Sequence, residues 1–127
     1  MRIHGIGIDI VEVGRIASAI ERHGERFLAR IFTPDERRYC EAHKQPNPHF
    51  AARFAAKEAI SKALGTGIGG NAGLLEMEVV RGETGAPSVR LSGAADAFVR
   101  EHGITEIRIS LSHTLQFAAA NAIAIAE

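Results

Sequence analysis

Alternating apolar and polar positions predict five strands in this chain, over residues 3–10, 75–81, 88–91, 106–112 and 117–126. In the first strand one face carries Ile6, Ile8 and Ile10, and the other carries Gly5, Gly7 and Asp9. The last strand has alanine at every second position on one face. A helix or a second chain is therefore expected to pack closely against it. A glycine-rich turn at residues 82–85 predicts a hairpin between the second and third strands.

Helical periodicity predicts helices over residues 13–23, 25–32, 34–42, 50–64 and 93–102. Thr33 and Glu36 have the spacing of a capping box, and Ser92 is expected to cap the last helix. Pro46 and Pro48 predict a loop over residues 43–49. Helices and strands mix without a βαβ rhythm. This order indicates one α+β domain spanning residues 1–127, with a mainly antiparallel sheet packed with a long helix.

Charge and composition narrow the class of protein. The 127 residues include 15 Lys and Arg and 15 Asp and Glu, so the net charge is zero. This balance argues against a nucleic-acid-binding protein that relies on bulk charge, and it gives little repulsion against self-association. The single cysteine, Cys40, excludes an internal disulfide and reads as a packing residue. No membrane span or signal peptide is expected, so we expect a cytoplasmic protein.

The helix predicted over residues 50–64 carries the most informative side chains. Arg53, Lys57, Glu58 and Lys62 lie among Phe and Ala, and the helix has no fully polar face. Glu58 and Lys62 have the spacing of an ordinary surface pair. Burial of charge is costly, however, so four ionisable groups in this setting point to a bound polyanion or metal.

Asp9 also has two interpretations. It stands where a carboxylate would cap the following helix, but the glycines on its face leave room for a ligand. One Asp and one Glu, with water at the remaining positions, suit Mg²⁺.

The six histidines lack the spacing of zinc ligands, although His113 stands at a strand-to-turn junction where polar groups can converge. The loop over residues 65–73 lacks the Walker pattern.

Two segments, GIGIDI at residues 5–10 and FAAKEAISKA at residues 54–63, resemble the signature motifs of 4′-phosphopantetheinyl transferases. The chain length, the loop GTGIG and the Ser112–Thr114 turn resemble those of the short bacterial members. The resemblance covers essentially the whole chain. It implies the fold of that family, and transfer of phosphopantetheine from coenzyme A to a serine of an apo acyl carrier protein, for fatty acid synthesis. Adenosine 3′,5′-bisphosphate is the implied second product.

The resemblance also implies roles for particular residues. Asp9 and Glu58 would bind Mg²⁺, and Lys62 would contact the phosphates, which makes these three the implied catalytic residues. The implied coenzyme A contacts are Arg53, Lys57, Lys62 and His113. Either Glu58 or a metal-bound water near Asp9 would accept the proton of the serine hydroxyl.

The same resemblance implies an assembly. The short members are homotrimers that bind coenzyme A between neighbouring chains. The double-length members carry a second acidic residue two positions after the first motif Asp, where this chain has Val11. A third protein carboxylate from that position is therefore missing, and water is expected to replace it.

A basic stripe is expected to dock the acidic carrier protein. It comprises Arg15, Arg22, Arg26 and Phe27 in the segment after Asp9. Two other functions use the same Asp9, Glu58 and Lys62. One is a magnesium-dependent hydrolase of nucleotide-like pyrophosphates, and the other is a non-catalytic oligomeric module that binds nucleotides. Neither of them requires a basic docking helix.

Overall fold

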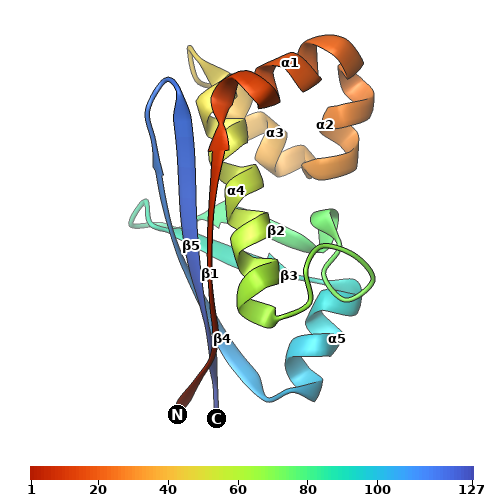
Figure 1. Cartoon of the computed structure of the whole chain (residues 1–127), viewed down its shortest axis with the longest axis vertical. Helices are drawn as coiled ribbons and strands as arrows, with labels where there is room; N and C mark the ends of the chain where they lie inside the picture. The colour runs from red at the N-terminus through yellow and green to blue at the C-terminus, as the bar shows by residue number, and fades with distance from the viewer.

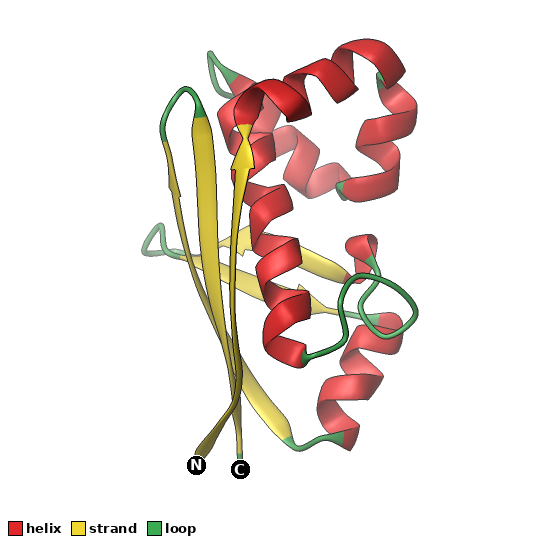
Figure 2. Cartoon of the chain, in the orientation of Figure 1, coloured by secondary structure: helices red, strands yellow, loops and turns green.

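A computed structural model describes all 127 residues and contains two antiparallel sheets and five α-helices (Figures 1 and 2). The order along the chain is β1 (Arg2–Glu12), α1 (Val13–His23), α2 (Glu25–Ile31), α3 (Pro34–Glu41), α4 (Pro46–Leu64), the 3₁₀ turn η1 (Leu74–Glu76), β2 (Met77–Arg81), β3 (Pro87–Leu91), α5 (Gly93–Glu101), β4 (Ile104–His113) and β5 (Phe117–Ala126). The predicted α+β class is confirmed. No helix is long and apolar enough to cross a membrane.

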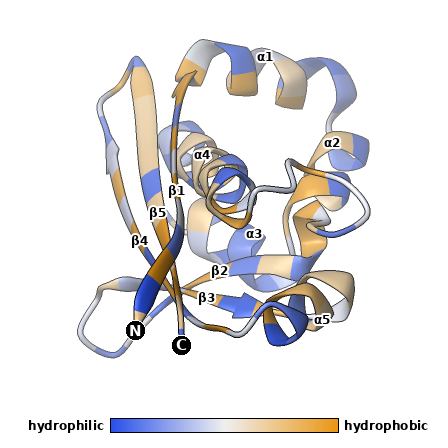
Figure 3. Cartoon of the chain, turned by 60° about the horizontal axis from the view of Figure 1, so that its bottom comes forward, coloured by the Kyte–Doolittle hydropathy of each residue, from blue (hydrophilic) through white to orange (hydrophobic).

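Helix α4 is the centre of the fold. It lies against the sheet of order β1-β5-β4, and it also contacts α1, α3 and β2. Figure 3 looks nearly along α4 and shows the sheet, the β2–β3 hairpin and the N-terminal helices arranged around it. Thirteen of its 19 residues are buried, which explains why the helix has no polar face.

The predicted start of α4 was wrong. We expected a loop over residues 43–49, but the helix begins at Pro46 and includes Pro48. The first four backbone N–H groups of a helix have no partner within it, so proline at these positions removes no hydrogen bond. Both prolines fall in that first turn. They extend α4 by one turn beyond the predicted start at Phe50.

The glycines of β1 set how closely this strand approaches α4. A Cβ atom at Gly5 would overlap the carbonyl oxygen of Ala63, and one at Gly7 would overlap that of Ala59. The adjacent strand β5 presents its alanine face to the same helix, and Ala118 through Ala124 are buried at alternate positions. The expected close packing of that face is therefore provided by α4. Small side chains on both strands bring backbone and helix together.

The opposite face of the sheet is uncovered. Ile6, Ile8 and Ile10 are 65%, 68% and 67% exposed, and Phe117 of β5 is 46% exposed. The register pairs Ile6 with Ile123, which places further apolar atoms on the same face. A single chain thus leaves apolar side chains of β1 and β5 exposed to water, beside Asn121 and the polar side chains of β4.

Two helix starts were predicted from their caps. The Thr33 hydroxyl accepts from the Glu36 N–H, and the Glu36 carboxylate accepts from the Thr33 N–H, so this capping box is confirmed. Ser92 makes no side-chain cap at α5. Instead, the carboxylate of Glu76 accepts from the N–H groups of Ala94 and Ala95, at 3.1 and 3.3 Å. A residue distant in sequence therefore replaces the predicted local cap.

Candidate functional site

Asp9, Glu58 and Lys62 meet where the end of β1 lies against α4. Lys62 Nζ donates to the carbonyl oxygen of Ile8 at 2.9 Å and lies 3.3 Å from Asp9 Oδ1. The Lys62 side chain is 52% exposed and that of Asp9 is 19% exposed. The close approach at Gly7 permits this contact, because it brings the backbone of β1 onto the helix. The two predicted motifs therefore form one cluster of Asp9, Glu58 and Lys62, which is open to solvent on the lysine side. We call it the acidic cluster, because two of its three side chains are carboxylates.

The electrostatics of this cluster favour a bound cation. Partial burial raises the pKa of the Glu58 carboxyl, the negative charge of Asp9 raises it further, and Lys62 opposes both effects. Two carboxylates held this way repel one another, and a divalent cation between them would relieve the repulsion. No group of three or more His, Cys, Asp or Glu side chains could hold a metal ion. Two protein oxygens suit Mg²⁺, which keeps several waters and uses substrate phosphates as ligands.

Lys57 does not belong to this cluster. Its side chain is fully buried, and its ammonium donates to Ile31 O, Glu36 Oε1 and Leu74 O at 2.7, 2.8 and 2.7 Å. An ammonium has three N–H donors, so none remains for a phosphate. The resemblance implied a contact between Lys57 and coenzyme A. The structure corrects this expectation and gives Lys57 a role in joining α4 to α3 and η1.

Arg53 and His113 line a second feature, a pocket of about 300 Å³ between α3, α4, the β2–β3 hairpin and β4. We call it the basic pocket. Its ionisable side chains are Tyr39, His43, His49, Arg53, Arg81 and His113. The lining includes no carboxylate, and neither arginine forms an ion pair. A concave surface with this charge favours an anionic ligand.

One buried donor in the basic pocket has no partner. The guanidinium of Arg53 stacks on the Tyr39 ring at 3.9 Å from its centroid, and the residue is only 5% exposed. Its Nε atom is buried and makes no hydrogen bond. Buried polar groups are normally satisfied, so this N–H is a donor without an acceptor from the chain itself. Arg81 Nη1 donates to the Tyr39 hydroxyl at 2.5 Å and completes the pocket wall.

The predicted docking residues lie on α1 and α2, immediately after the end of β1. Arg15, Arg22 and Arg26 are exposed, and none of them forms an ion pair. Phe27 is only partly exposed, because its ring packs edge-on against Phe32 at 6.5 Å. The three arginines thus present free charge on the two helices that follow β1, whereas Phe27 packs against the core.

Sequence reasoning missed four residues of the basic pocket: Tyr39, His43, His49 and Arg81. Their positions span more than 40 residues and show no spacing pattern that would reveal the cluster.

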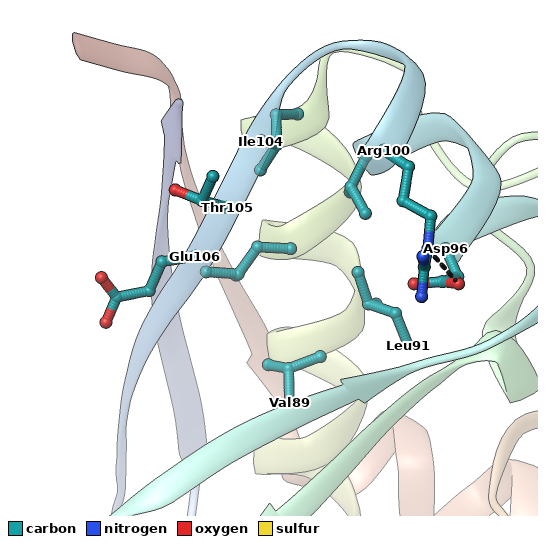
Figure 4. Close-up of a pocket in the computed structure, with 9 residues that line it drawn as sticks. Val89, Leu91, Asp96, Arg100, Ile104, Thr105 and Glu106 are labelled. Atoms are coloured by element: carbon teal, nitrogen blue, oxygen red, sulfur yellow. Dashed lines mark hydrogen bonds and ion pairs between the residues drawn. The ribbon is translucent and has the colours of Figure 1, made fainter. Parts of the chain in front are cut away.

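Figure 4 shows a different hollow, of about 310 Å³, between β3, α5 and β4. Its floor is apolar and its Arg100 pairs with Asp96 at 2.9 Å, so it lacks the free cations of the basic pocket.

Comparisons with known proteins find similarity over nearly the whole chain. Residues 5–123 match the model of the 4′-phosphopantetheinyl transferase superfamily. The chain is 49% identical to a holo-[acyl-carrier-protein] synthase of Ruminiclostridium cellulolyticum, over 93% of this chain and 89% of that protein. It is 46% identical to one of Chlamydia pneumoniae, over 99% and 100%.

Solved structures of such synthases have the same fold. The structure from Neisseria meningitidis aligns with a TM-score of 0.91 and 34% identity, covering 98% of this chain and 99% of that one. The structure from Helicobacter pylori, a complex with coenzyme A, aligns with a TM-score of 0.84 and 33% identity, covering 94% and 99%.

Proposed function

Because the chain belongs to the 4′-phosphopantetheinyl transferase superfamily, as do the holo-[acyl-carrier-protein] synthases it resembles, we propose the following reaction for it. The enzyme transfers 4′-phosphopantetheine from coenzyme A to a serine of an apo acyl carrier protein in the cytoplasm, and releases adenosine 3′,5′-bisphosphate. The observation that carries this proposal is the cluster of Asp9, Glu58 and Lys62, in which two carboxylates and a half-exposed lysine converge.

Asp9 and Glu58 would hold Mg²⁺. The bound ion would supply positive charge to the pyrophosphate of coenzyme A. The protein itself contributes rigid placement, because one carboxylate comes from a strand and the other from a buried helix. Lys62 is exposed enough to reach a phosphate oxygen, and its bond to Ile8 O fixes where its ammonium lies.

Glu58 is the side chain best suited to accept the proton of the serine hydroxyl. A carboxylate has two oxygens, so one can accept a proton while the other would hold the metal ion. In the metal-free protein, partial burial and the charge of Asp9 raise the pKa of the Glu58 carboxyl, a shift that a bound cation would oppose. Loss of the hydroxyl proton to Glu58 leaves an alkoxide that attacks phosphorus, and adenosine 3′,5′-bisphosphate departs as the leaving group.

The basic pocket would bind the remaining phosphate of coenzyme A, through Arg53 and His113. This pocket and the acidic cluster lie on opposite sides of α4, because Arg53 and Glu58 are five residues apart, or roughly 140° around the helix. Asp9 is on one edge strand of the sheet and His113 is on the other, with β5 between them. A coenzyme A molecule that contacts an acidic cluster and a basic pocket at the same time would therefore bind between two chains.

A homotrimer is the assembly we propose for this arrangement. The uncovered face with Ile6, Ile8 and Ile10 gives an apolar surface for association, and zero net charge opposes it little. The exposed Arg15 and Arg22 would then remain available on α1, the helix that follows the strand of Asp9. Their positive charge would attract and orient the acidic carrier protein.

The deciding experiment is the intact mass of an apo acyl carrier protein after incubation with this protein, coenzyme A and Mg²⁺. We expect a gain of one phosphopantetheine group, lost when EDTA is added. Cleavage of coenzyme A without a change in carrier mass would instead identify a hydrolase. Intact coenzyme A with unchanged carrier would indicate a binding module.

Glu58→Gln tests the acidic cluster directly. The amide preserves shape but removes the proton acceptor and one metal-binding charge, so we expect transfer to fall at least about a hundredfold with the unfolding midpoint unchanged. Glu101→Gln, an exposed glutamate at the end of α5, is the matched control. Transfer by the Glu58 variant at near the control rate would contradict the proposed site.

A further inference from the structure

Three histidines from three different parts of the chain meet in the basic pocket. The His43 and His49 rings stack with centroids 3.6 Å apart, and His113 meets His49 edge-on at 4.8 Å. The hydrogen bond between His43 Nδ1 and the Tyr39 carbonyl, at 2.9 Å, places a hydrogen on Nδ1. The other ring nitrogen of His43 is therefore free to take up a proton.

The other ionisable side chains that line the pocket around the stacked pair are neutral or positive. By element, these neighbours are Tyr39 from α3, Arg53 from α4, Arg81 from β2 and His113 from β4. Burial, and after it the charges of His43, His113 and the two arginines, together lower the pKa of His49 to about 4. In the absence of an anion, His49 is therefore held in its neutral form at pH 7.

We propose that His43 and His49 couple anion binding in this pocket to the uptake of a proton from solvent. A phosphate dianion beside the stacked rings reverses the local potential, so an imidazole that was kept neutral becomes a cationic donor. The proton adds to a ring nitrogen and no bond breaks in the ligand. This inference rests on the proposed use of the basic pocket for a phosphate of coenzyme A. It makes affinity for that substrate rise as pH falls.

Inorganic sulfate is the probe, because it remains a dianion at every pH where the protein is folded. Binding is followed by NMR of the intact protein at pH 7.5, 6.5 and 5.5. We expect the sulfate Kd to fall by more than about tenfold, and by up to about a hundredfold, across this range, because one fully linked proton changes the affinity tenfold per pH unit. In the same spectra, the midpoint of titration for a His43 or His49 ring should move up when sulfate is saturating. This second measurement needs no variant.

Variants separate this inference from the proposed function. The double variant His43→Gln/His49→Gln should bind sulfate with less than about a twofold change over the pH range. His23→Gln, an exposed histidine at the end of α1, should behave as the wild type. Arg53→Ala should weaken sulfate binding at every pH.

The outcomes differ for each idea. If Arg53→Ala leaves the affinity unchanged, the pocket is not the phosphate site and the proposed binding mode fails. If Arg53→Ala weakens binding but the wild type shows no pH dependence, only the proton coupling is overturned. A pH dependence that persists in the double variant and disappears in His113→Gln would assign the proton to His113 and overturn the role of the stacked pair.

Discussion

Lys57→Met tests whether the first lysine of the signature helix holds the fold or the substrate. Methionine keeps the length of the side chain but removes three hydrogen bonds and the partner of Glu36, which is 1% exposed. Removing one member of a buried ion pair costs about 3–5 kcal/mol, because the other charge stays buried without compensation. Glu36 still accepts from the N–H groups of Thr33 and Val79, both at 2.8 Å, so we take the lower end of that range.

The assay is urea unfolding followed by circular dichroism, at one fixed protein concentration. A loss of about 3 kcal/mol with a slope of about 1.5 kcal/mol/M lowers the midpoint by about 2 M. Lys62→Met is the matched control on the same helix. Its side chain is half exposed, so we expect less than about 1 kcal/mol of destabilisation but a large loss of transfer.

The two substitutions are therefore expected to have opposite effects: Lys57→Met lowers stability, and Lys62→Met lowers transfer. A Lys57 variant that keeps its unfolding midpoint within about 0.5 M and raises the KM for coenzyme A would refute the structural role. It would show instead that Lys57 reaches the substrate as the resemblance implied. Equal destabilisation by both substitutions would mean that burial does not distinguish a structural Lys57 from a substrate-binding Lys62.

Three further predictions follow from individual contacts. Gly7→Ala should destabilise the protein by at least about 2 kcal/mol, because the added methyl overlaps the Ala59 carbonyl; Gly14→Ala, with open space around its Cβ, should be neutral or stabilising in the same thermal melt. Arg15→Glu should raise the KM for the carrier protein far more than that for coenzyme A in steady-state assays, and equal changes would argue against docking. Burial raises the pKa of the Cys40 thiol to about 12, so iodoacetamide at pH 8 should modify it only after unfolding, as mass spectrometry would detect.

Local patterns sufficed to predict most of the helices and strands, and to single out Asp9, Glu58 and Lys62 as residues that lie together. Glycine at positions 5 and 7 of a strand has few explanations other than a close backbone contact, and the structure shows that contact with α4. The capping box at Thr33 depends only on residues within one turn, so it was readable from the chain. The predicted Ser92 cap was wrong, because Glu76, which is distant in sequence, caps α5 instead. The predicted start of α4 was wrong, because the first turn of a helix accepts the two prolines that indicated a loop.

The sequence by itself determined which residues carry charge on an apolar helix, and that Asp9 shares a face with glycines. Tertiary structure alone decided what each charge does. Lys57 and Glu58 are neighbours in sequence, yet one points into the core and the other towards Asp9, because successive helical residues are about 100° apart and α4 packs against different elements on different sides. The basic pocket is likewise a property of the fold, since its histidines and arginines come from separate elements that only packing brings together.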